Sequence, residues 1–161
     1  MLHRSRLFPA FALILAVPAA ICEAQPQSRP KSAADLVMLL EKSGHKYSKV
    51  DDGVWEIMYE GKNMKSIPVR VTMAEGVLVT LAKLADRKDI RPDPALLTKV
   101  LELNNDFDYV KLALSKSMLY VRMDTPLRLL DGDELNHALE QVSAAADEAY
   151  PQITRFIAPA K

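Results

Sequence analysis

The residues best suited to acid–base or metal chemistry are two histidines, His45 and His137. Histidine titrates near neutral pH and is a frequent metal ligand. However, neither histidine belongs to a spaced metal motif such as HExxH. His137 follows Asp133 and Glu134 closely enough to lie beside their carboxylates in a helix. We therefore expect surface or capping histidines, with no bound metal and no cofactor.

Carboxylates form the next candidate group, at Asp51–Asp52, Asp106–Asp108 and Asp131–Glu134. Hard cations prefer oxygen ligands, yet none of these clusters has the spacing of a calcium loop. Turn and helix-cap chemistry accounts for all three. Glu56 and Glu60 could act as the paired acids of a hydrolase. Alternation along their strand places both opposite its apolar face, so we expect them to be solvated.

Like charges face each other in the last predicted hairpin, where Lys111 pairs with Arg122. Such a pair is unfavourable unless something compensates it. One explanation is a neighbouring carboxylate, such as Asp124 or Glu56. The other is an acidic protein partner that docks beside the Tyr120 ring. Both remain open, and Lys111, Tyr120 and Arg122 are the candidate partner-binding residues.

Three helices are predicted by caps and apolar spacing, and six strands by alternation between them. The helices run from Ser32 to Gly44, from Asp93 to about Asn105, and onward from Asp131. The strands form hairpins, Lys46–Val50 with Val54–Tyr59, Ile67–Met73 with Val77–Leu84, and Tyr109–Ser115 with Met118–Asp124. Short hairpin loops make the sheet antiparallel. The fold class is therefore α+β, with the order α-β-β-β-β-α-β-β-α, about five or six strands, and helices packed on the sheet.

The side chains of the second hairpin favour a three-residue loop, Ala74–Gly76. This loop places apolar partners together on one face. It pairs Met73 with Val77, Val71 with Val79, and Val69 with Leu81. A one-residue shift would turn the whole apolar set to the other face. We therefore expect the three-residue loop, with Gly76 left-handed.

The second helix has apolar residues on more than one stripe. Either the helix is buried deeply within its own monomer, or part of it packs against a second subunit. Both interpretations remain open. In the second, Leu97, Val100 and Leu101 form a homodimer interface.

The first 24 residues have the layout of a secretory signal peptide. Arg4 and Arg6 precede the apolar run Leu7–Ile21, and small residues lead to a cleavage site after Ala24. The run is shorter than the roughly 20 residues that a membrane-spanning helix needs. Cys22 offers lipidation as an alternative, although Ile21 before it is larger than lipoprotein processing prefers. We expect a periplasmic or secreted protein without a stable membrane anchor.

Composition agrees with one folded domain over residues 32–157, preceded by a flexible leader, residues 25–31. The whole chain has 161 residues, 49% of them hydrophobic, and its 21 basic residues balance 21 acidic ones. This balance argues against nucleic acid as a partner. The only cysteine lies in the signal peptide, and no GxSxG, GxGxxG or P-loop motif occurs. We therefore predict no catalytic residues and no enzyme.

The order of these elements and their residue patterns resemble those of the YbjN-type family. That family is described as bacterial sensory transduction regulators with the fold of type III secretion chaperones. The similar features are Trp55–Ile57 before the Ile67–Met73 strand, a helix closing at Leu103–Asn105, the Lys111–Asp124 hairpin, and an acidic-capped last helix containing Leu135. The resemblance covers about residues 32–157. It implies a small, non-enzymatic binding module that is often dimeric and has no catalytic residues.

The leading hypothesis is therefore an exported protein-interaction module with a secretion-chaperone-like fold, acting as a homodimer. Its protein partner is not identified by the sequence. The alternative is a periplasmic small-ligand-binding protein or hydrolase, with a pocket between the sheet and the flanking helices.

Overall fold

A computed structural model describes residues 32–91 and 93–157. The predicted signal peptide and leader lie outside these described residues. The helices are α1 (Ala33–Ser43), α2 (Pro94–Asp106) and α3 (Gly132–Ile153), with 3-10 turns η1 (Arg87–Asp89) and η2 (Thr154–Phe156). The strands are β1 (Tyr47–Asp51), β2 (Val54–Tyr59), β3 (Ile67–Ala74), β4 (Val77–Asp86), β5 (Lys111–Leu114) and β6 (Met118–Pro126).

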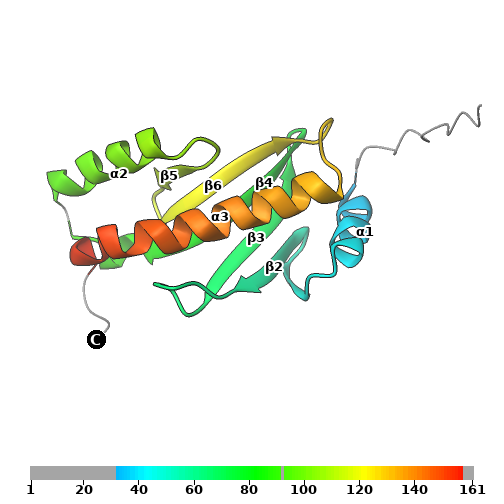
Figure 1. Cartoon of the computed structure of the whole chain (residues 1–161), viewed down its shortest axis with the longest axis horizontal. Helices are drawn as coiled ribbons and strands as arrows, with labels where there is room; N and C mark the ends of the chain where they lie inside the picture. Colours follow the sequence, from blue (N-terminus) through cyan, green and yellow to red (C-terminus); the bar gives the residue numbers. More distant parts are fainter. Residues whose placement is uncertain (1–31, 92, 158–161) are drawn as a thin grey trace, which may run out of the picture.

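The six strands form one sheet in the order β1-β2-β3-β4-β6-β5, and all neighbours are antiparallel. Helix α3 lies across the sheet, while α1 and α2 stand at opposite ends of the molecule (Figure 1). The predicted α+β class and the order of elements are confirmed.

Each helix begins at the polar residue that the sequence indicates. Ser32 and Asp35 form a reciprocal capping box, and α1 ends at Gly44 in the left-handed conformation. The Asp93 carboxylate accepts a 2.8 Å hydrogen bond from the amide of Ala95. Asp131 likewise accepts from the amide of Glu134 at 2.9 Å. These caps satisfy amides that have no partner inside their own helix.

The core forms between α3 and the central strands. Leu135, Leu139, Val142 and Ala146 are spaced along one face of α3 and are fully buried. This face packs against β3, β4 and β6. Burial of this apolar stripe is the main force that holds α3 on the sheet, because helix propensity alone contributes little.

The predicted loop of the second hairpin is wrong. Ala74 pairs with Val77, so the turn contains only Glu75 and Gly76, both with positive φ (46° and 83°). Such a turn matches the natural twist of two paired strands. One face of β4 then carries Leu78, Thr80 and Ala82, all fully buried, while Val77 and Val79 lie on the other face, where Val79 is also buried. By contrast, the last hairpin has the predicted register, with Lys111 opposite Arg122.

The new register buries Thr80, whose hydroxyl has no hydrogen-bond partner in the described part of the chain. A buried hydroxyl without a partner is destabilising. Replacing Thr80 with valine is therefore expected to raise the free energy of unfolding by about 1 kcal/mol. Urea denaturation measures this change.

Thr72→Val is the matched control, because Thr72 lies on the opposite face of the sheet, on β3, and is only half-buried. Its effect should stay within about 0.5 kcal/mol. A loss of stability in Thr80→Val would contradict the prediction, since it would mean that the hydroxyl is satisfied in solution.

Candidate functional site

The like charges of the last hairpin are each compensated within the chain. The Lys111 amine donates to the carbonyls of Asn104 and Phe107, at 2.9 and 2.6 Å, where α2 ends. Arg122 donates to the Asp124 carboxylate at 2.7 Å, and this bond raises the pKa of Arg122. A cation at a helix C-terminus is favourable because the free carbonyls there carry partial negative charge.

Of the two carboxylates considered for this role, Asp124 is the one that pairs with Arg122. Glu56 instead accepts a 2.8 Å hydrogen bond from Arg70. Tyr120 belongs to the β6 strand of the last hairpin, where it is half-buried and lies opposite Ala113. The role of Lys111, Tyr120 and Arg122 in binding an acidic partner stays a prediction.

Helix α2 has two apolar faces. Leu96 and Leu103 are buried in the core, whereas Leu97 and Leu101 are 55% and 70% exposed. Leu114 of β5 is also exposed and lines a cavity together with Leu97. We call Leu97, Leu101 and Leu114 the leucine strip. Of the three predicted interface residues, Val100 is half-buried against the core, and only the other two belong to the strip.

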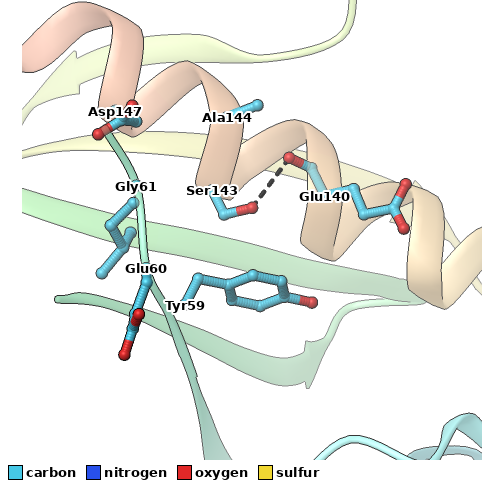
Figure 2. A pocket seen from close by; sticks show the side chains of 8 residues that line it. Tyr59, Glu60, Gly61, Glu140, Ser143, Ala144 and Asp147 are labelled. Atoms are coloured by element: carbon cyan, nitrogen blue, oxygen red, sulfur yellow. Dashed lines mark hydrogen bonds between the residues drawn. The ribbon is translucent and has the colours of Figure 1, made fainter. Parts of the chain in front are cut away.

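A cavity of about 350 Å³ lies between α3 and the end of β2 (Figure 2). Its lining residues include the buried Ile67 and two acidic residues, Glu60 and Glu140. Neither carboxylate has a hydrogen bond or ion pair within the described residues. Glu56, the other acid of the hydrolase interpretation, forms an ion pair with Arg70 and is not among the residues that line this cavity.

Tyr59 lines the same cavity, and its hydroxyl is buried without a partner in the described part of the chain. Burial and the nearby Glu140 carboxylate raise the pKa of Tyr59 to about 12. The phenol therefore stays protonated and neutral at physiological pH. It cannot serve as a general base there, and its buried hydroxyl is not exposed to a ligand in this structure.

The two histidines lie apart from each other. His45 approaches the Asn136 side-chain oxygen at 3.1 Å, and its ring is 5.8 Å from that of Tyr59. His137 packs edge-on against Tyr109 at 5.2 Å. Within the described residues, no three histidine, cysteine or acidic side chains gather in a group that could hold a metal ion.

One carboxylate of α3 holds the loop between β2 and β3. Asp147 accepts hydrogen bonds from the amides of Lys62, Asn63 and Met64 at 3.0, 2.8 and 2.7 Å. These bonds, led by that from the Met64 amide, lower the pKa of Asp147. We call this arrangement the Asp147 clasp. Sequence reasoning missed it because an acidic residue on a helix normally indicates a solvated surface.

The lowered pKa makes the clasp sensitive to acid. A carboxyl group whose folded-state pKa is depressed stabilises the fold above its unfolded pKa, which is about 3.9 for aspartate. That contribution is lost as the pH falls through the folded-state value. The stability advantage of the wild type over Asp147→Asn should therefore shrink as the pH is lowered from 7 to 2.

Thermal denaturation across this pH range measures the effect. Glu148→Gln provides a matched control, because Glu148 is an exposed neighbour on the same helix. An advantage of the wild type over Asp147→Asn that stays constant with pH would contradict the prediction.

No helix in the described part of the chain combines the length and apolarity needed to cross a membrane. The fold itself has known counterparts. A family model described as TY-Chap1, "T3SS (YopN, CesT) and YbjN peptide-binding chaperone 1", matches residues 39–155. No curated protein matches the sequence significantly.

Solved structures share the architecture at low identity. YbjN from E. coli superposes with a TM-score of 0.59 at 15% identity, covering 80% of this chain and 97% of that one. A chain of the ExsC–ExsE complex gives 0.56 at 9% identity, covering 75% and 95%. A chain of the heterodimeric ExoU–SpcU complex from the Pseudomonas aeruginosa type III secretion system gives 0.48 at 16% identity, covering 76% and 98%. At these identities the first two establish a shared fold.

Proposed function

Since the chain belongs to the family of type III secretion and YbjN peptide-binding chaperones, we propose that it is an exported, non-enzymatic protein that binds other polypeptides as a homodimer. The family and its fold support a protein-binding role. One observation carries the homodimer, namely the exposure of Leu97 and Leu101 on α2.

The leucine strip is the proposed dimer interface. Isolated exposed leucines are common on protein surfaces, but neighbouring ones on a helix and an adjacent strand indicate an interaction site. Leu97 and Leu101 are four residues apart and therefore lie on the same side of α2. In a symmetric dimer, the strip of each copy packs against that of the other.

Size-exclusion chromatography with light scattering tests the homodimer. The proposal expects twice the monomer mass at micromolar concentrations and above. A monomer at the highest attainable concentration would overturn the homodimer, but it would leave peptide binding to be tested separately.

Export rests on residues 1–24, which carry the charge and apolar pattern of a signal peptide. Cleavage after Ala24 removes 24 of the 161 residues and leaves 137. Mass spectrometry of the native protein distinguishes the outcomes. The mass of the 137-residue chain is expected. An intact N-terminus would contradict cleavage. An added lipid mass on Cys22 would assign the chain to the lipid-modified proteins instead.

Small-ligand binding is the second candidate function, favoured by the cavity beside α3. Glu60 and Glu140 line it, and neither carboxylate has a hydrogen bond or ion pair in the described structure. This arrangement suits a small cation with an apolar part. Thermal denaturation with a panel of alkylamines tests it. A rise in Tm that Glu140→Gln abolishes would support this function, and no rise with any amine would exclude such ligands.

A further inference from the structure

A second cavity, of about 420 Å³, lies at the start of α2. Leu96, Leu97 and Leu114 supply its apolar surface, and Arg87, Arg91 and Asp93 supply its charged groups. Its size falls within the usual range for ligand pockets, about 300–1,000 Å³. It also adjoins the leucine strip, because Leu97 and Leu114 belong to both.

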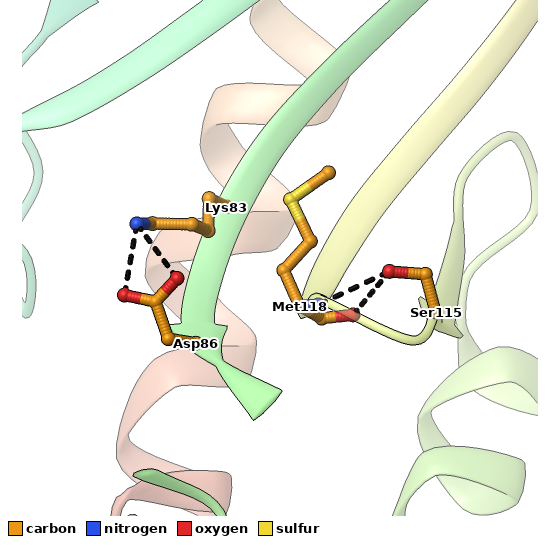
Figure 3. Close-up of polar contacts among 4 residues, drawn as sticks. All are labelled: Lys83, Asp86, Ser115 and Met118. Carbon is orange, nitrogen blue, oxygen red and sulfur yellow. Dashed lines mark hydrogen bonds and ion pairs between the residues drawn. The ribbon is translucent and has the colours of Figure 1, made fainter. Parts of the chain in front are cut away.

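Two arginines and one acid, Asp93, line this cavity, so its charged groups leave a net positive charge. Neither Arg87 nor Arg91 has a side-chain hydrogen bond or ion pair within the described part of the chain. Asp86, beside Arg87, pairs with Lys83 at 3.2 Å instead (Figure 3). Asp93 uses its carboxylate to cap α2. Two guanidinium groups therefore remain available to an anion.

The backbone that carries these groups is held in place. The Arg87 amide donates to the Ser117 carbonyl at 2.8 Å, and the Arg91 amide donates to the Phe156 carbonyl at 2.9 Å. Ser115, which follows Leu114, fixes the β5–β6 turn through its hydroxyl, which bonds to the backbone of Met118 at 3.1 Å (Figure 3). The cavity is thus formed before any ligand arrives, which lowers the entropic cost of binding.

We propose that this cavity binds the C-terminal carboxylate of a polypeptide whose last residue is apolar. The inference rests on the proposed peptide-binding function and names the part of the peptide that is recognised. Guanidinium groups form strong paired hydrogen bonds with carboxylates. A chain terminus carries its carboxylate and its last side chain on one carbon atom. This geometry suits two arginines, Arg87 and Arg91, beside a leucine-lined wall.

Binding of one pentapeptide in two forms tests the proposal. The probe is fluorescein-labelled Ser-Gly-Leu-Val-Leu, with either a free carboxylate or a C-terminal amide, measured by fluorescence anisotropy. The free carboxylate should bind at least about tenfold more tightly. Arg87→Gln and Arg91→Gln should each reduce this preference, and the double variant should remove it. Arg128→Gln, at an exposed site in the loop before α3, should leave it unchanged.

The remaining outcomes separate this proposal from the one on which it rests. Equal binding of both forms would overturn carboxylate recognition and leave peptide binding intact. Binding of neither form would count against both proposals. Decanoate serves as a competitor, and one outcome is that it displaces the labelled peptide at lower concentrations than the unlabelled peptide does. That result would assign the cavity to fatty acids and overturn the peptide assignment. A second copy of the chain that covers Leu97 would compete with the peptide. This competition weakens the binding of the carboxylate and amide forms equally, so the preference for the free carboxylate stays measurable.

Discussion

Replacing Gly61 with alanine is expected to lower the free energy of unfolding by about 1–3 kcal/mol. A Cβ atom at this position would lie 2.2 Å from a carboxylate oxygen of Asp147 and 3.0 Å from its Cβ. The Asp147 side chain must then rotate away, and it loses the bonds of the clasp. The loop between β2 and β3 consequently loses its attachment to α3. Urea denaturation measures the change.

Two further variants identify the cause. Gly132→Ala is the matched control, because a Cβ there meets no atom within 4 Å; its effect should be neutral or slightly stabilising. In an Asp147→Ala background, Gly61→Ala should cost clearly less than in the wild type. Equal costs in the two backgrounds would show that the clash with Asp147 is not the reason for the glycine.

Replacing Leu101 with glutamate should turn the proposed homodimer into a monomer. Leu101 is the most exposed large apolar residue on α2, so the folded monomer tolerates a charge there. In the dimer the same charge would be buried against the leucine strip of the partner. An uncompensated buried charge costs about 3 kcal/mol or more, which corresponds to at least about a 100-fold weaker dimer.

Light scattering across a concentration series measures this shift, and circular dichroism verifies that the fold is retained. Leu129→Glu is the control, because Leu129 is half-exposed and lies in the loop before α3. It should leave the dimer intact. A dimer of wild-type strength in Leu101→Glu would move the interface away from α2.

Features determined by neighbouring residues were predictable from the sequence. Ser32, Asp93 and Asp131 cap their helices as expected, since capping depends on only the next three residues. The last hairpin also has its predicted register, because only one face of β6 is strongly apolar. Leu119, Val121 and Met123 form that face.

The second hairpin was not predictable in this way. Strand β4 carries apolar residues on both faces, so either register buries several apolar side chains. The structure chooses the one in which Glu75 and Gly76 adopt the left-handed turn. This choice buries Thr80, a polar residue that apolar alternation would never select for the core.

The candidate sites depend on contacts between distant parts of the chain. Asp147 meets Asn63 from 84 positions away, and the cavity at α2 joins residues of η1, α2 and β5. Charge patterns along the sequence cannot show that Asp86 turns toward Lys83 and leaves Arg87 unpaired. By contrast, the two-faced character of α2 was visible in the sequence, although its division into a core face and an exposed face required the structure.

The proposed protein-binding function is tested most directly by titration of an unfolded polypeptide. A carboxymethylated, fluorescently labelled polypeptide that cannot refold serves as the ligand, and anisotropy reports binding. Saturable binding to the wild type is expected, and Leu129→Glu, which lies outside both the leucine strip and the cavity at α2, should bind equally well. Absence of saturable binding to the wild type would contradict the proposed function.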